Sequence, residues 1–168
     1  VKDTFLQRAT VVRTIRRVLD EAGYTEVETP TLQAIAGGAS ARPFITHFNA
    51  LNIDMYMRIA TELYLKRLTV GGFEGVYEIG KNFRNEGMDR NHNPEFTCME
   101  LYVQYKDYNW MMSFTEKLLE TVCIAVNGST ERKVGDNVIS FKAPYRRLPI
   151  LDAIKEKTGF DCNGKSEE

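Results

Sequence analysis

The sequence has no excess of basic charge and no long apolar run, and each absence narrows the class of protein. Its 22 lysines and arginines stand against 23 aspartates and glutamates, which leaves a net charge of -1. A segment that gripped a nucleic-acid backbone by itself would carry a basic excess, so such a partner must be held mainly by other residues. No apolar run approaches the roughly 20 residues of a membrane helix, so we expect no membrane partner.

Cysteine is also scarce. Cys98, Cys123 and Cys162 are odd in number, far apart and in no close-spaced pair. This spacing argues against both a disulfide framework and a zinc site, and we expect no metal site in the chain. The thiols are expected to be reduced and the protein to be cytoplasmic.

What is present fits one soluble globular domain, with 43% hydrophobic and 27% charged residues in 168. Apolar residues at helical spacing predict an amphipathic helix over residues 5–21, stopped by Gly23. The remaining pattern predicts strands at 24–29, 44–51, 55–59, 76–83 and 96–105, helices at 61–69, 109–126 and 151–157, and a short hairpin of 132–134 with 138–141. Hairpins predominate over βαβ units, so we predict an α+β fold with an antiparallel sheet flanked by helices.

Three details of this prediction concern single residues. Thr61 is placed to cap the helix at 61–69. The inward face of the helix at 109–126 is expected to consist of Trp110, Phe114, Leu118, Leu119 and Val122. One face of the strand at 96–105 is predicted to be core, with Thr97, Met99, Leu101, Val103 and Tyr105.

The other face of that hairpin is unusually polar. Residues 83–102 read FRNEGMDRNHNPEFTCMELY, and strand alternation places Phe96, Cys98, Glu100, Tyr102 and Gln104 on one face. The preceding strand contributes Glu78, Gly80, Asn82 and Arg84 in the same way. A carboxylate in the middle of a strand, as at Glu100, is costly unless it meets a cation.

Two interpretations of this face remain open from periodicity alone. In the first, Arg84 pairs with Glu100 or Glu86 on a solvated surface, where ion pairs are common and contribute little. In the second, the face is the floor of a pocket. Arg84 would then offer a planar fork to a phosphate or carboxylate, Phe96 a ring for a base, and Glu100 with Tyr102 acceptors for a cationic substrate.

A resemblance favours the pocket. Phe83–Glu86, His92–Phe96 and Met99–Tyr102 resemble the second signature motif of class II aminoacyl-tRNA synthetases, in the form used by lysyl-tRNA synthetases. The resemblance extends from about Phe5 to Tyr108 and fades in the tail. Further stretches that resemble the family are Val27–Pro30, Gly37–His47, Arg58–Leu65 and Val70–Phe73. Thr61 departs from the family, which usually has proline there.

The resemblance implies adenylate chemistry with ATP, magnesium and L-lysine. It implies Arg84 as the catalytic residue, bridging the lysine carboxylate and the α-phosphate. The implied ATP-binding residues are Arg84, Glu86, His92, Asn93 and Phe96. The implied lysine-binding residues are Gly38, Glu62, Arg84, Glu100 and Tyr102, with Glu62 and the Gly38 backbone meeting the α-amino group and the last two holding the ε-ammonium group.

The resemblance also implies a domain organisation. Residues 1–168 would be the N-terminal portion of a class II catalytic domain, with the first motif at about 12–31 and the second at about 76–105. The anticodon-binding domain and the third motif are not in this sequence, and the magnesium ligands are expected in a C-terminal part beyond it. We therefore expect little activity from these residues alone. A homodimer through residues of about 5–31 is implied, and tRNA(Lys) would be held mainly by other regions.

Alternatives stay open at this point. The protein could be a lysyl-synthetase-like paralog that lysylates a translation elongation factor, or an inert module with a synthetase-like fold. On position alone, Glu62 is a solvated helix residue and His92 is a loop hydrogen-bonder. Gly37–Gly38 could be a simple turn.

Overall fold

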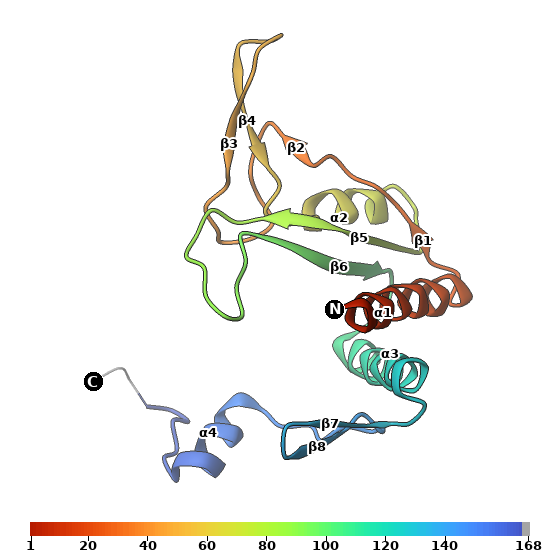
Figure 1. The fold of residues 1–168 in the computed structure, drawn as a ribbon. Coiled ribbons are helices and arrows are strands. Elements are labelled where there is room, and N and C mark those ends of the chain that lie inside the picture. Colours follow the sequence, from red (N-terminus) through yellow and green to blue (C-terminus); the bar gives the residue numbers. More distant parts are fainter. Residues whose placement is uncertain (166–168) are drawn as a thin grey trace. The chain divides into compact units, whose positions relative to one another are not determined.

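The computed structural model describes residues 1–165, which form two compact units (Figure 1). The first unit is Val1–Met111 and the second begins at Met112. Among the described residues, no helix combines the length and apolar character that crossing a membrane would require.

The first unit is built around a three-stranded sheet in the order β1-β5-β6. Helix α1 (Lys2–Glu21) leads into β1 (Thr25–Glu26), which pairs in parallel with β5 (Gly75–Phe83). β5 pairs antiparallel with β6 (Glu95–Val103), so the predicted hairpin is confirmed. The expected strand at 24–29 is shorter than predicted, and its parallel pairing makes this sheet mixed rather than purely antiparallel.

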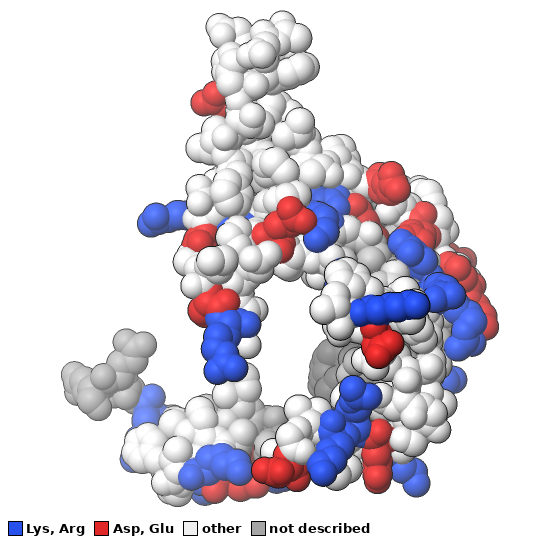
Figure 2. Space-filling model, viewed as in Figure 1, with Lys and Arg blue, Asp and Glu red and all other residues white. Residues whose placement is uncertain are grey.

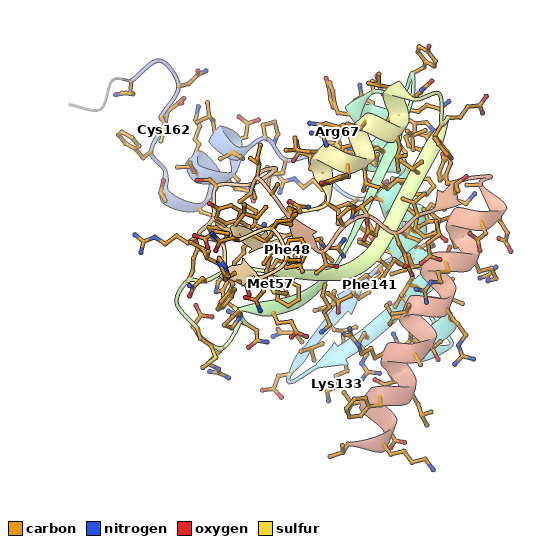
Figure 3. All side chains as sticks on the ribbon, turned by 90° about the horizontal axis from the view of Figure 1, so that it is seen from above. Phe48, Met57, Arg67, Lys133, Phe141 and Cys162 are labelled. Atoms are coloured by element: carbon orange, nitrogen blue, oxygen red, sulfur yellow. The ribbon has the colours of Figure 1, made fainter. Side chains whose placement is uncertain are left out.

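A second sheet in the same unit has the order β2-β4-β3 and is antiparallel throughout. Its strands are β2 (Leu32–Gln33), β3 (Ile45–Phe48) and β4 (Ile53–Met57). The β3–β4 hairpin turns at Asn52, whose φ of 51° is one that asparagine tolerates. Figure 3 labels Phe48 and Met57 on these two strands, and the hairpin is almost free of charge in Figure 2. Helix α2 (Glu62–Val70) follows β4.

The core of the first unit is formed by residues of α1, α2 and β5. Leu19, Leu65, Val76 and Tyr77 are fully buried. The Tyr77 hydroxyl donates to Asp20 Oδ1 at 2.8 Å, and burial together with that hydrogen bond raises the pKa of the phenol. Tyr77 therefore links the end of α1 to the first part of β5 as a neutral donor.

The second unit holds most of α3 (Tyr108–Asn127), the hairpin of β7 (Glu131–Val134) and β8 (Asn137–Ser140), and α4 (Ile150–Thr158). All four elements confirm the predicted segments. On α3, Leu118 and Cys123 are buried, but Leu119 is 39% exposed, so its predicted inward position is wrong. Glu116 is buried instead, and its carboxylate pairs with Arg147.

Two other expectations also fail on β6 and α2. Thr61 precedes α2 at the cap position, but its side chain makes no cap hydrogen bond and its buried hydroxyl has no partner in the described part of the chain. Tyr105 lies beyond the end of β6 with φ of 55° and is 99% exposed, so it is not core. The buried polar side chains of β5, Glu78 and Asn82, lie on the face that was predicted to be polar.

Candidate functional site

The β5–β6 register confirms that the polar residues share one face. Glu78 lies opposite Glu100, Gly80 opposite Cys98, and Asn82 opposite Phe96. Residues directly opposite each other in an antiparallel pair point to the same side of the sheet. The polar face predicted from alternation is therefore continuous across both strands.

A cavity of about 240 Å³ lies at the turn between the two strands. It is lined by Arg84, Glu86, Gly87, Asn91, His92, Asn93 and Phe96. All five residues predicted to bind ATP are among them, drawn from the end of β5, the loop and the start of β6. The guanidinium carbon of Arg84 lies 5.2 Å from the centroid of the Phe96 ring, which is a cation–π distance.

The polar residues of this cavity are held by backbone contacts. The Arg84 N–H donates to the Pro94 carbonyl at 2.8 Å, which closes the base of the loop. Glu86 Oε1 accepts from the backbone N–H of Arg42 at 3.2 Å, and the Asn85 N–H donates to the Arg42 carbonyl at 2.7 Å. The segment before β3 thus fixes one oxygen of Glu86 and leaves the other for a ligand.

His92 is oriented by an acidic neighbour in the loop. Asp89 accepts from the backbone N–H groups of Asn91 and His92 at 2.7 and 2.8 Å, and His92 Nδ1 lies 2.8 Å from its carboxylate. These hydrogen bonds lower the pKa of Asp89. Since a carboxylate only accepts, Nδ1 carries the proton in this contact and Nε2 is the nitrogen left for another partner.

The residues predicted to bind lysine form a second cluster at the start of α2. Glu100 Oε1 accepts from the Thr61 N–H at 3.3 Å, and Oε2 accepts from the Tyr102 hydroxyl at 3.2 Å. Within residues 1–165, Glu100 therefore accepts from two neutral donors, and a cationic ligand would add to these contacts. Burial, and then the charges of Glu100 and Glu62, raise the pKa of Tyr102, which keeps the phenol protonated as a donor.

Gly38 lies against the same helix start. Its φ is +89°, and a Cβ placed there would lie 3.2 Å from the Ala60 Cβ and 3.3 Å from the Glu62 Cβ. Only glycine takes this conformation and this closeness without strain. The backbone of the Gly37–Gly38 segment is thereby held beside Glu62.

The two clusters are joined by the chain between β4 and α2. The Ile59 carbonyl accepts from Arg84 Nε at 3.4 Å, while the Thr61 N–H donates to Glu100. The Cys98 thiol lies within the electrostatic influence of Glu100 and Arg84. Burial and then the Glu100 charge raise the pKa of the thiol, and the Arg84 charge opposes that shift. Arg84 and Glu100 therefore act on one neighbourhood, although Glu62 and Glu100 do not line the cavity at the turn. Arg84 forms no ion pair with any residue from 1 to 165, so the surface-pair interpretation is wrong.

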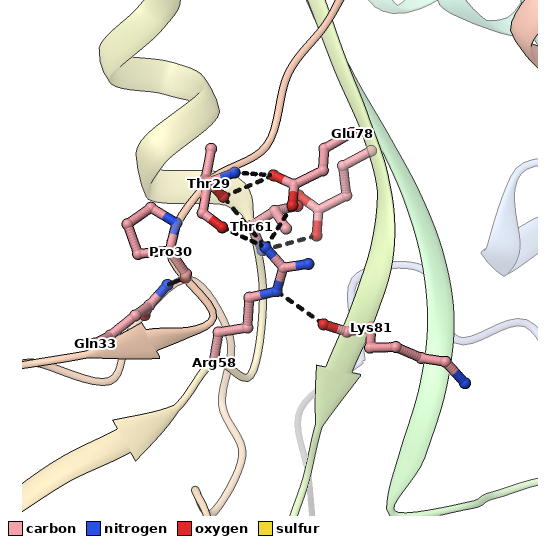
Figure 4. Close-up of polar contacts among 8 residues, drawn as sticks. Thr29, Pro30, Gln33, Arg58, Thr61, Glu78 and Lys81 are labelled. Carbon is pink, nitrogen blue, oxygen red and sulfur yellow. Dashed lines mark hydrogen bonds and ion pairs between the residues drawn. The ribbon is translucent and has the colours of Figure 1, made fainter.

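A buried network beneath this face was missed from the sequence (Figure 4). The Arg58 and Glu78 side chains, each 4% exposed, form an ion pair. Arg58 Nε donates to the Lys81 carbonyl at 2.8 Å, and Glu78 Oε2 accepts from the Thr29 hydroxyl at 2.6 Å. A Cβ on Gly80 would collide with the Arg58 guanidinium. The available signal was a pair of opposite charges flanked by apolar residues, at Met57-Arg58-Ile59 and Tyr77-Glu78-Ile79.

A magnesium ion does not fit the residues at hand. Within residues 1–165 there is no group of three or more histidine, cysteine, aspartate or glutamate side chains that could hold a metal. The site consists instead of one guanidinium, neutral donors, a ring and carboxylates, which suits an organic ligand with both charges.

The comparisons with known proteins agree with this arrangement. The family model for class II tRNA synthetases of the D, K and N group matches residues 1–166, and the chain belongs to that family. Among its relatives are proteins named lysine–tRNA ligase. One from Porphyromonas gingivalis is 64% identical over 167 residues, covering 99% of this chain and 29% of the relative.

Two further relatives carry the same name. The protein from Christiangramia forsetii is 64% identical over 100% of this chain and 30% of its own length. That from Clostridium novyi is 61% identical over 97% of this chain and 32% of its own length. The chain thus spans about three tenths of the curated relatives it matches.

Proposed function

We propose that this chain is part of a lysine–tRNA ligase, which activates L-lysine with ATP to lysyl-adenylate and transfers the lysyl group to tRNA(Lys). One observation carries the proposal. Residues 59–61 link Arg84, through the Ile59 carbonyl, to Glu100, through the Thr61 N–H. A site for a nucleotide and a site for an ammonium compound therefore adjoin, as an adenylate-forming reaction of lysine requires.

In the first step, an oxygen of the lysine carboxylate attacks the α-phosphorus of ATP, and the bond to the bridging oxygen of pyrophosphate breaks. Arg84 holds both anions and offsets the negative charge that develops between them. Phe96 stacks on the adenine with the ring face that Arg84 leaves open. The free oxygen of Glu86 accepts from the adenine amino group, and His92 and Asn93 reach the polyphosphate from the loop.

As the family resemblance implies, magnesium and further phosphate ligands would be supplied by other residues of the parent protein. In the second step, a hydroxyl of the tRNA attacks the lysyl carbonyl carbon and AMP leaves. The 168 residues by themselves are expected to catalyse little pyrophosphate exchange for the same reason.

The amino-acid pocket selects lysine by charge. Glu62 and the Gly38 backbone bind the α-ammonium group, and Glu100 and Tyr102 bind the ε-ammonium group. A neutral side chain of similar length would leave the partly buried Glu100 facing no cation. Norleucine should therefore be rejected by a factor of about 100, since it cannot form the charge-assisted hydrogen bonds of an ε-ammonium group, each worth about 1.5–3 kcal/mol.

The experiment is a replacement. In the lysine–tRNA ligase of Porphyromonas gingivalis, the segment that matches residues 1–168 is replaced by these residues. Pyrophosphate exchange that depends on the amino acid is then measured in the chimera. We expect exchange with L-lysine and about 100-fold less with norleucine. A chimera that is folded by circular dichroism but inactive with lysine, or equally active with norleucine, would contradict the proposal.

We further propose that the protein is a cytoplasmic homodimer that pairs through residues of about 5–31. Two apolar side chains of α1 support this: Phe5 is 67% exposed and Leu6 53%. The three free cysteines support a reducing compartment. Light scattering of the chain and of a Phe5→Asp, Leu6→Asp variant tests the dimer, because the variant should be monomeric at concentrations where the unmodified chain pairs.

A further inference from the structure

One lysine of the chain itself contacts the residues assigned to the substrate lysine. Lys66 lies one turn after Glu62 on α2, and its Nζ is 2.5 Å from Glu62 Oε1. The same Nζ lies 6.0 Å from the centroid of the Tyr102 ring. Both neighbours, Glu62 and Tyr102, belong to the candidate amino-acid pocket.

Lys66 has the same chemical group as the ligand that this pocket is built for. Its primary ammonium group pairs with a carboxylate that would otherwise face water or a cationic ligand. The Lys66 side chain is 57% exposed, so it can swing into solvent without breaking packed contacts. Glu62 is less exposed, at 32%, and Gly38 lies so close to it that an added Cβ would be 3.3 Å from the Glu62 Cβ.

We propose that Lys66 is an internal counter-ion of the amino-acid pocket, bound to Glu62 while the pocket is empty and displaced by the α-ammonium group of lysine. This inference rests on the proposed function. Binding then exchanges one ammonium group for another at the Glu62 carboxylate. This competition weakens the binding of L-lysine, because the substrate must displace an ammonium group that is tethered beside Glu62.

The expected size of the effect follows from the kind of ion pair. Partly exposed pairs, including pairs one turn apart on a helix, are weak. Removing the competitor should therefore tighten the binding of L-lysine by about two- to fivefold. A ligand that has no α-ammonium group does not compete for Glu62, so its affinity should not change.

The test compares two ligands and three variants of the chain by NMR titration. The ligands are L-lysine and 6-aminohexanoate, which keeps the carboxylate and the terminal ammonium group but has no α-amino group. Lys66→Met removes the competitor, and Lys66→Arg retains a cation. Arg67→Met is the matched control: Arg67, labelled in Figure 3, carries the same charge on the same helix, and its guanidinium lies over the Tyr64 ring, 5.1 Å away.

We expect Lys66→Met to bind L-lysine two- to fivefold more tightly and 6-aminohexanoate unchanged, whereas Lys66→Arg and Arg67→Met bind both ligands as the unmodified chain does. Unchanged or weaker L-lysine binding in Lys66→Met would overturn the inference and leave the proposed function intact. So would equal tightening for both ligands, since that would be a general effect of charge. Failure of the unmodified chain to bind L-lysine would contradict the proposed function itself.

Discussion

Arg84 lies over the ring of Phe96 while its Nε donates to the carbonyl of Ile59, so one side chain joins β6 to the segment before α2. The guanidinium is thereby oriented on one side by a π face and on another by a carbonyl oxygen. A planar cation held in this way presents its remaining N–H groups in a fixed direction. Four predictions concern this arginine and other residues of the candidate site and its surroundings.

The first prediction concerns the shape of the cation at position 84. Arg84→Lys keeps the charge but loses the planar fork and much of the contact with Phe96. Binding of a non-hydrolysable lysyl-adenylate analogue should weaken at least about tenfold, measured by calorimetry. Lys81→Met is the control, because Lys81 is on the other face of β5, where it pairs with Glu95. Equal affinities of Arg84→Lys and the unmodified chain would show that charge alone suffices.

The second prediction concerns the buried pair of Arg58 and Glu78. Arg58→Met leaves the Glu78 carboxylate buried without its cation, and should lower the free energy of unfolding by about 3–5 kcal/mol in urea. A double variant, Arg58→Met with Glu78→Met, should regain much of that loss because no charge is stranded. Arg17→Met removes an exposed pair with Glu21 and should cost less than about 1 kcal/mol. Similar losses for Arg58→Met and Arg17→Met would contradict the burial argument.

The third prediction concerns the glycine beside Glu62. Gly38→Ala places a Cβ against Ala60 and Glu62 at a φ that costs a non-glycine residue about 1–2 kcal/mol. We expect weaker L-lysine binding together with this loss of stability. Gly128→Ala is a matched control, since its φ is also positive, at +74°, but a Cβ there meets nothing within 4 Å, so it should lose stability without weakening L-lysine binding. If the two alanine variants behave alike in both measurements, the close approach at Gly38 is unimportant.

The fourth prediction concerns pH and the loop that carries His92. The pKa of Asp89 is held below its ordinary value of 3.8 by hydrogen bonds from the Asn91 and His92 backbone and from the imidazole. A lowered pKa in the folded state stabilises the loop above pH 3.8, and this contribution is lost as the pH falls through the folded value. The amide resonances of Asn91 and His92 should therefore shift together below pH 3.8. In Asp89→Asn that transition should be absent, and a persisting one would assign it to another group.

Strand periodicity predicted much of the fold and the polar face of the β5–β6 hairpin, while the family resemblance supplied the roles of the site residues. The period of two placed Glu100 and Phe96 on one face, and the β5–β6 register confirms it. The five candidate nucleotide residues line one cavity because they follow each other through a single turn of chain. A local sequence pattern can predict which side chains lie together when those residues are close in sequence or alternate strictly along a strand.

The remainder depended on tertiary contacts that no local pattern contains. Arg58 and Glu78 are 20 residues apart, and their pairing requires β5 to lie beside the end of β4. Glu100 was expected to need a cation, but the folded chain brings it the Thr61 N–H and the Tyr102 hydroxyl. Tyr105 continued the alternation of β6, yet its φ of 55° takes it out of the strand. Thr61 has the right residue type for a cap, but its hydroxyl is buried without a partner.

The contact between Gly80 and Arg58 should couple the residues that relatives carry at these two positions. Its missing side chain is the space that the Arg58 guanidinium fills above β5. Any larger residue at position 80 would displace the Arg58 guanidinium and leave the buried Glu78 carboxylate without its cation. Substitutions at position 80 alone or at position 58 alone should therefore be rare among relatives. Where one of the two has changed, the other is expected to have changed with it.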